Sequence, residues 1–167
     1  MRLVLPAVLA VLALAACDSG DAIDPPSPAD IAGTYAFEAF RFRPAASALA
    51  PVDVLDTLVA TDSYVQFFDG GQAILQFRRA GGTTRFVPGD VEVRRDQVRL
   101  TFQGGNDATL ARLVLPNVLV FDREDDGGLT VTESFTADLE AYDVDRYAGF
   151  DAIPGTLTLR LRLDAAE

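Results

Sequence analysis

The chain has 167 residues, of which 49% are hydrophobic, and a formal net charge of −11. All 14 basic residues are arginine, and the chain has one cysteine and no histidine. This composition excludes an intramolecular disulfide, a histidine-dependent active site and a histidine metal site, and the acidic charge argues against binding to nucleic-acid phosphates. We therefore predict no nucleic-acid partner, no cofactor, no metal site and no enzymatic activity.

The chain opens with a short basic start and an uncharged apolar run over residues 3–16. A helix needs about 20 apolar residues to span a bilayer, so this run has the length of a signal-peptide core. It ends in Leu14-Ala15-Ala16-Cys17, which resembles the bacterial lipobox. The resemblance implies that residues 1–16 are removed and that Cys17 carries a diacylglyceryl group and usually an N-acyl chain. Because two or more acyl chains anchor a protein durably, the membrane is the predicted partner and the bacterial cell envelope the predicted location.

Two alternatives stay open for this segment. The first is an ordinary secretory signal followed by a chance cysteine. The second concerns the membrane: Asp18 follows Cys17 and resembles an inner-membrane retention signal of enteric bacteria, a rule that other phyla do not follow. The sequence therefore leaves the choice between inner and outer membrane unresolved.

Residues 17–30 form the predicted tether between the lipid anchor and the folded domain. The stretch is rich in proline, aspartate and small residues, a composition that cannot bury a core. As an extended segment of about 13 residues at about 3.1 Å each, it would reach about 40 Å. The folded domain is predicted over residues 31–167.

Short segments of strand-like alternation follow, separated by turns rich in glycine, proline and aspartate. The predicted strands are residues 34–43, 52–60, 64–68, 72–79, 83–87, 91–95, 98–103, 109–115, 118–123, 129–137 and 156–164. A tight turn is predicted at Pro88-Gly89-Asp90, because proline fixes φ and glycine permits a reversal. Residues 138–150 are the one place where a short helix is predicted, with Leu139, Tyr142 and Tyr147 as its apolar contacts.

The first predicted strand changes phase. Tyr35 and Phe37 alternate on one face, whereas Phe40 and Phe42 fall on the other, which predicts a bulge or a bend near Ala39. The last predicted strand alternates strictly: Leu157, Leu159, Leu161 and Leu163 are expected inside, and Arg160 and Arg162 outside.

Short connections between strands at this spacing favour antiparallel neighbours. The predicted fold is all-β, an antiparallel up-and-down β-barrel, with a β-sandwich as the alternative. In the barrel, the last strand pairs with the first and leaves no free edge.

This pattern, with Gly33-Thr34-Tyr35 opening an aromatic strand, resembles the bacterial lipocalin-like (calycin) domains. The resemblance implies a barrel that can hold a small ligand, and an arginine packed over the aromatic ring of the opening motif. The family motif is Gly-x-Trp, whereas this chain has Tyr35 and no tryptophan. Arg160 and Arg162 are the candidates for that arginine.

Residues 122–133 resemble a twelve-residue calcium loop. Asp122, Glu124 and Asp126 occupy the first, third and fifth positions, Gly127 the sixth and Glu133 the twelfth. However, an apolar strand precedes the loop where an entering helix is required. We therefore prefer a β-hairpin with an acidic turn, and calcium binding stays as the alternative.

The predicted function is that of a membrane-anchored, non-catalytic lipoprotein that binds a small apolar ligand in the barrel. The alternative is a structural or protein-interaction lipoprotein with a filled barrel and no ligand. A hollow interior of several hundred Å³ would favour the first and a packed interior the second. The sequence identifies no ligand-binding or catalytic residue, and it leaves protein partners and oligomeric state open.

Overall fold

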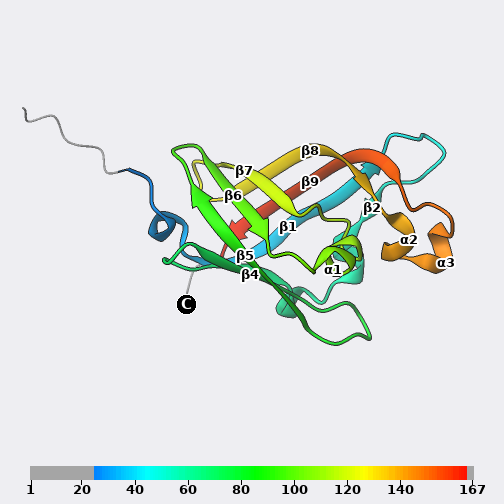
Figure 1. The fold of residues 1–167 in the computed structure, drawn as a ribbon, viewed down its shortest axis with the longest axis horizontal. Helices are drawn as coiled ribbons and strands as arrows, with labels where there is room; N and C mark the ends of the chain where they lie inside the picture. The colour runs from blue at the N-terminus through cyan, green and yellow to red at the C-terminus, as the bar shows by residue number, and fades with distance from the viewer. Residues whose placement is uncertain (1–24, 165–167) are drawn as a thin grey trace, which may run out of the picture.

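The computed structural model describes residues 25–164 (Figure 1). The predicted signal peptide, the lipidation site Cys17 and the tether up to residue 24 lie outside the described residues. The strands are β1 (Gly33–Pro44), β2 (Val52–Asp53), β3 (Tyr64–Phe67), β4 (Gln72–Phe77), β5 (Arg85–Val93), β6 (Gln97–Phe102), β7 (Val118–Arg123), β8 (Leu129–Ala137) and β9 (Ile153–Leu163). The helices are the 3-10 turns η1 (Pro28–Ile31), η2 (Val54–Thr57) and η3 (Ala60–Asp62), and the α-helices α1 (Asp107–Ala111), α2 (Leu139–Tyr142) and α3 (Val144–Tyr147).

The strands form one antiparallel sheet that closes on itself. They follow each other in the order β2-β1-β3-β4-β5-β6-β7-β8-β9, and an additional pairing joins β1 to β9. Because β2 pairs with β1 at only two positions, the closed barrel consists of the other eight strands. The up-and-down barrel and the pairing of its last strand with its first are confirmed, and the β-sandwich alternative is wrong.

The phase change in β1 is a bulge. The register between β1 and β9 shifts between Phe37 and Ala39, so that Glu38 has no partner on β9. The extra residue turns the strand by one position, which puts Tyr35 and Phe40 on the same side of the sheet. The predicted bulge is confirmed, and Tyr35 and Phe40 are both buried in one core.

Apolar side chains fill the barrel interior. Aromatic and aliphatic residues from strands all around the wall have no measurable exposure, and a side chain with zero exposed area touches no space wide enough for water. These residues include Phe40, Phe42, Val98, Leu100, Phe121, Leu157 and Leu161. At the positions they occupy, the interior is packed as densely as a protein core requires.

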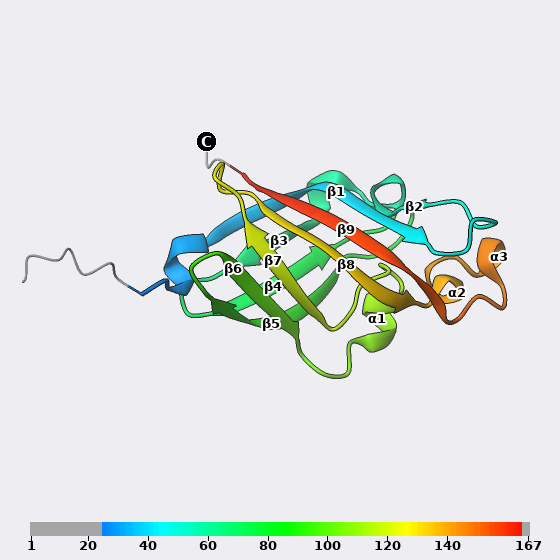
Figure 2. The same cartoon turned by 90° about the horizontal axis from the view of Figure 1, so that it is seen from above.

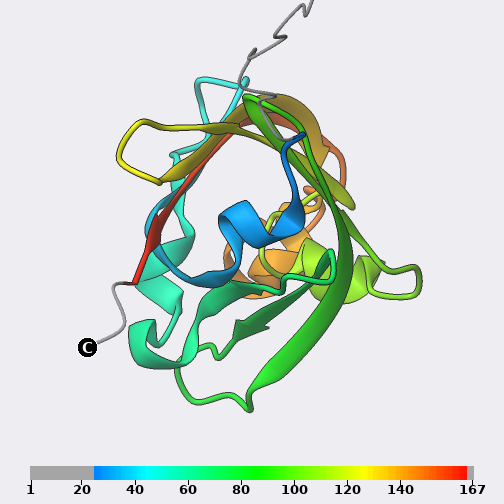
Figure 3. The same ribbon diagram turned by 90° about the vertical axis from the view of Figure 1, so that its left-hand side faces the viewer.

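Helical segments cover the two ends of the barrel. η1 lies across one end, where Ile31 is 3% exposed (Figure 3). α2 and α3 lie at the opposite end, and Figure 2 shows α1 beside them. The predicted helix is thus two short helices that meet at Asp143, which has extended backbone angles and serves as C-cap of α2 and N-cap of α3. No helix in residues 25–164 has the length and hydrophobicity that a bilayer-spanning helix requires.

The turn predicted at Pro88-Gly89-Asp90 is wrong, because β5 runs straight through it. Pro88 pairs with Ile74 of β4, whereas the β5–β6 ladder begins only at Gly89. At that ladder end the missing amide of proline costs little. Gly89 is required by close packing, since a Cβ there would lie 2.7 Å from Cδ1 of Leu100.

Two predicted strands are helical turns. Residues 52–60 contain the two-residue β2 followed by η2, where the Asp53 carboxylate accepts a hydrogen bond from the Leu55 amide at 3.2 Å and the Thr57 hydroxyl donates to the Val54 carbonyl at 2.9 Å. Such local bonds compete with strand pairing. Residues 109–115 contain the end of α1 and a buried turn. The strand prediction failed there because a short apolar run has no distinct helical or strand period.

The alternation of β9 holds for three of its four leucines. Leu157, Leu159 and Leu161 are at most 1% exposed, whereas Leu163 is 42% exposed. Leu163 pairs with Tyr35 at the end of the ladder and lies over Gly33, where the barrel wall ends. The inward assignment of Leu163 is therefore wrong.

Candidate functional site

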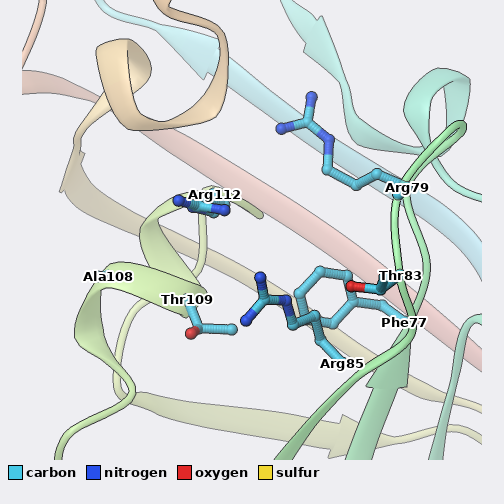
Figure 4. Close-up of a pocket in the computed structure, with 8 residues that line it drawn as sticks. Phe77, Arg79, Thr83, Arg85, Ala108, Thr109 and Arg112 are labelled. Carbon is cyan, nitrogen blue, oxygen red and sulfur yellow. The ribbon is translucent and has the colours of Figure 1, made fainter.

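A cleft opens between the β4–β5 connection and α1 (Figure 4). It lies at the barrel end opposite η1 (Figure 1). Its volume is about 300 Å³. The residues around it are basic, small, hydroxylated or aromatic, and no acidic residue is among them. They are Phe77, Arg79, Gly82, Thr83, Arg85, Ala108, Thr109 and Arg112.

One wall of this arginine cleft, the turn that follows β4, is held by backbone hydrogen bonds. The Gly82 amide donates to the Arg79 carbonyl at 2.9 Å, and Gly81 adopts a φ of 75°, which favours glycine at that position of the turn. The Ala80 amide donates to the Thr57 carbonyl at 2.9 Å. The segment that carries Arg79 is thereby fixed to the neighbouring chain.

The guanidinium of Arg79 is itself positioned. Its Nη1 donates to the Tyr142 carbonyl at 2.6 Å, and its Cζ lies 4.8 Å from the centroid of the Tyr142 ring. Tyr142 belongs to α2 and is 6% exposed, and its burial raises the pKa of its hydroxyl. Neither the carbonyl nor the ring carries a negative charge, so these contacts position the guanidinium of Arg79 without forming an ion pair.

The second wall is the exposed side of α1. Leu110 and Leu113 are buried beneath it, with exposures of 1% and 0%. The spacing of a helix then turns Ala108, Thr109 and Arg112 away from the core and toward the cleft. Figure 4 shows Arg112 and Thr109 on this side, facing Arg79 and Arg85 from the hairpin.

The three arginines of the cleft are among the arginines of residues 25–164 that have no carboxylate within 4.0 Å. Arg41, Arg78, Arg94 and Arg160 each lie within 4.0 Å of a carboxylate. Within residues 25–164, no carboxylate lies that close to Arg79, Arg85 or Arg112. Three unpaired guanidinium groups around one small cleft repel one another, and an anion between them would relieve that repulsion.

The chemistry of the lining fits an organic acid. Guanidinium groups bind carboxylate and phosphate oxygens through paired hydrogen bonds, and the hydroxyls of Thr83 and Thr109 add further donors. Phe77, at the end of β4, is 3% exposed and lines the cleft with the small part of its side chain that stays accessible, which gives the cleft an apolar contact. The arrangement can hold an anion with a small apolar body.

The two candidate arginines lie on the solvent side of β9, where Arg162 is exposed and pairs with Ala36, the residue after Tyr35. Arg160 points out of the barrel and forms ion pairs with Glu38, Glu124 and Asp126 at 3.1, 2.7 and 3.1 Å. Tyr35 packs edge-on against Phe67, with 5.3 Å between ring centroids. Burial raises the pKa of the Tyr35 hydroxyl, and the positive charge of Arg123 opposes that rise.

Residues 122–133 form the β7–β8 hairpin, as the alternation predicts. Asp122 pairs with Thr130, and the Glu124 amide donates to the Gly128 carbonyl at 2.9 Å across the turn. The carboxylates of Glu124 and Asp126 bind Arg160 instead of converging with Glu133. In the described part of the chain, no group of three or more metal-ligating side chains is placed to hold a metal ion.

Glu133 instead lies on the inward face of β8. Its register partner is Leu157, which is fully buried, and paired residues of an antiparallel ladder share a face. Its Oε1 is buried and has no hydrogen-bond partner among the described residues. Desolvation raises the pKa of the Glu133 carboxyl.

Sequence reasoning missed the arginine cleft. Arg79 and Arg85 flank the glycine turn of one hairpin, a signal that could have placed them together. Arg112 is 27 residues further on from Arg85, on a segment predicted as a strand, and only the fold brings it to them.

No protein-family model matches the sequence, and no curated protein is significantly similar to it. Among solved structures, the chain is similar to a lipocalin-like protein from Bacteroides uniformis, with 14% identity and a TM-score of 0.41, over 75% of this chain and 97% of that one. It is also similar to an uncharacterized protein from Bacteroides eggerthii, with 13% identity and a TM-score of 0.33, over 74% of this chain and 97% of that one. The barrel itself is defined by the strand register of this chain, in which β1 pairs with β9.

Proposed function

We propose that this protein is a lipid-anchored, non-catalytic protein of the bacterial cell envelope that binds a small organic acid in the arginine cleft. The observation that carries the proposal is the convergence of Arg79, Arg85 and Arg112 on one cleft with no carboxylate among its lining residues. In a chain of net charge −11, three arginines that line one small cleft and have no ion pair within residues 25–164 form a local concentration of positive charge. An acidic ligand bound between the three arginines neutralises this positive charge.

The packed interior supports binding at the barrel end rather than along the barrel axis. Phe42, Leu100 and Leu157 have no exposed area, so a ligand chain in the middle of the barrel would have to displace them. The sequence suggested an apolar ligand inside the barrel. The ligand proposed here keeps an apolar part, which contacts Phe77, and adds an acidic group that the arginines hold.

A second candidate function is favoured by the same packed interior. A filled barrel on a lipid anchor can serve as a structural or protein-interaction module and bind no small molecule. The two candidates differ in one measurable respect, which is whether the arginine cleft binds organic acids in solution.

Isothermal titration with hexanoate and with hexanol tests the proposal. Hexanoate is expected to bind, and hexanol, which lacks the charge, to bind at least about tenfold more weakly. Arg85→Gln is expected to weaken hexanoate binding about tenfold, whereas Arg94→Gln, an exposed arginine on β5–β6 that pairs with Glu92 at 3.9 Å, should leave it unchanged. Equal binding of acid and alcohol, or equal effects of the two substitutions, would overturn the cleft proposal.

The anchor is tested separately by Cys17→Ser. If Cys17 carries acyl chains, the substitution should move the protein from the membrane fraction to the soluble fraction, because the chains supply about 0.8 kcal/mol per buried methylene. Mass spectrometry of the wild-type N-terminus should show a chain that begins at an acylated Cys17. A Cys17→Ser protein that still sediments with membranes would contradict the lipid anchor.

A further inference from the structure

A second cleft adjoins the arginine cleft and shares three of its lining residues. The shared residues are Arg79, Ala108 and Arg112, and the second cleft has a volume of about 710 Å³. Because the same two arginines line both, the clefts form one groove across the barrel end, running from Arg85 to α2. Arg79 and Arg112 stand between its two parts.

The far part of this groove is lined by acidic side chains. Asp138, Glu140 and Asp143, which lie at the start and end of α2, line the second cleft and are absent from the first. Each is half-buried. The groove therefore has an arginine end with no acid and an acidic end contributed by α2.

Backbone hydrogen bonds hold these three carboxylates in place. Asp138 Oδ1 accepts from the Ala141 amide at 2.7 Å, Glu140 Oε2 from the Gly149 amide at 2.8 Å, and Asp143 Oδ1 from the Arg146 amide at 3.2 Å. Each of these bonds occupies one oxygen of its carboxylate and leaves the second oxygen available to a ligand. Within residues 25–164, no arginine lies within 4.0 Å of these carboxylates, so their negative charge is not cancelled by a direct ion pair.

From these charges we infer that the groove binds a linear zwitterion, with a carboxylate at the Arg85 end and an ammonium group at the acidic end. The inference rests on the proposed function and narrows its ligand to compounds whose opposite charges lie at opposite ends, the class to which short peptides and ω-amino acids belong. A plain anion gains from the arginines but is opposed by the α2 carboxylates, and a plain cation has the reverse problem. Only a molecule with both charges satisfies both ends of the groove.

Titration with three matched series tests this inference. The first contains ω-amino acids with the chains of butyrate, hexanoate and octanoate, the second contains those carboxylates without the amino group, and the third contains the corresponding alkylamines. At least one ω-amino acid is expected to bind about tenfold more tightly than its carboxylate and its amine. If carboxylates bind and no ω-amino acid binds more tightly, the zwitterion inference fails while the proposed function stands. If no compound of any series binds, both fail.

Asp143→Asn separates charge from folding, because asparagine can still accept the hydrogen bond from the Arg146 amide. The variant is expected to weaken binding of the best ω-amino acid to the level of its carboxylate and to leave the carboxylate equal or stronger. Asp145→Asn, at an exposed neighbour outside the groove, should change neither. Arg85→Gln should weaken both ligands. A loss of both ligands in Asp143→Asn, or no change of either, would overturn the assignment of the acidic end.

Discussion

The barrel interior and the barrel end that carries α1 and α2 are built on opposite principles. Inside, residues such as Phe40 and Leu157 have no exposed area, and the wall closes without a free edge between β1 and β9. At the end, Arg79, Arg85 and Arg112 line an open cleft and have no acidic partner within 4.0 Å among residues 25–164. The comparison shows that the strands carry the apolar packing of this barrel, whereas the connecting segments carry the unpaired positive charge on which the proposed binding depends.

The largest effect that this contrast predicts is on the interior of β9. Leu159→Ala is expected to lower the free energy of unfolding by about 2–5 kcal/mol, because it removes buried methyl groups and leaves a cavity. Leu163→Ala is the matched control, since the same residue type on the same strand is 42% exposed there and should cost less than about 1 kcal/mol. Urea denaturation measures both. Equal costs would contradict the packed interior.

The next effect concerns close packing of β9 against β1. A Cβ at Gly155 would lie 2.5 Å from the Arg43 carbonyl oxygen and against the Phe42 ring, so Gly155→Ala should cost about 1–3 kcal/mol through strain. Gly104→Ala is the control, because a Cβ at that loop position would meet no atom within 4 Å. If Gly155→Ala is as stable as Gly104→Ala in the same urea experiment, the wall is looser than the structure indicates.

A smaller effect is expected from the one acid on the inward face of β8. Desolvation raises the pKa of Glu133 in the folded state, so the folded protein binds the proton more tightly than the unfolded chain. The contribution of this group to stability is fully present below the ordinary glutamate pKa and is lost as the pH rises through the raised one. Stability of the wild type should thus fall over that window.

Glu133→Gln should remove this part of the pH dependence and raise the melting temperature at neutral pH. Glu92→Gln, at an exposed position on β5, should change neither. Thermal denaturation of both variants from about pH 4, near the ordinary glutamate pKa, up to about pH 8 checks the prediction. A Glu133→Gln protein with the wild-type pH profile would show that the carboxylate is hydrated in the folded state.

The sequence was most informative where a strand has one buried and one wet face. The alternation of Leu157, Leu159 and Leu161 predicted their burial, and the phase change before Phe40 predicted the bulge of β1. The turn prediction at Pro88 failed, because a strand accepts proline where the neighbouring ladder ends, and the sequence does not show where that ladder ends.

The candidate site was beyond sequence reasoning for a similar reason. The cleft depends on the absence of acids near Arg79, Arg85 and Arg112 in space, and spacing along the chain does not report such an absence. Its second wall was also hidden, because residues 109–115 are apolar and buried and their helical turn has no distinct period. The sequence predicts local turns from glycine and proline, but it does not predict that the β4–β5 connection and α1 lie side by side at one barrel end.

The most direct test of the account is to locate a bound acid on the folded protein. Amide chemical shifts in a two-dimensional NMR titration with hexanoate should change at Gly82, Thr83 and Thr109, which line the arginine cleft, and stay unchanged at Leu157 and Leu159 inside the barrel. The same titration of Arg85→Gln should need about tenfold more hexanoate for the same change. Shifts confined to the barrel interior, or a titration that Arg85→Gln leaves unaltered, would contradict binding at the barrel end.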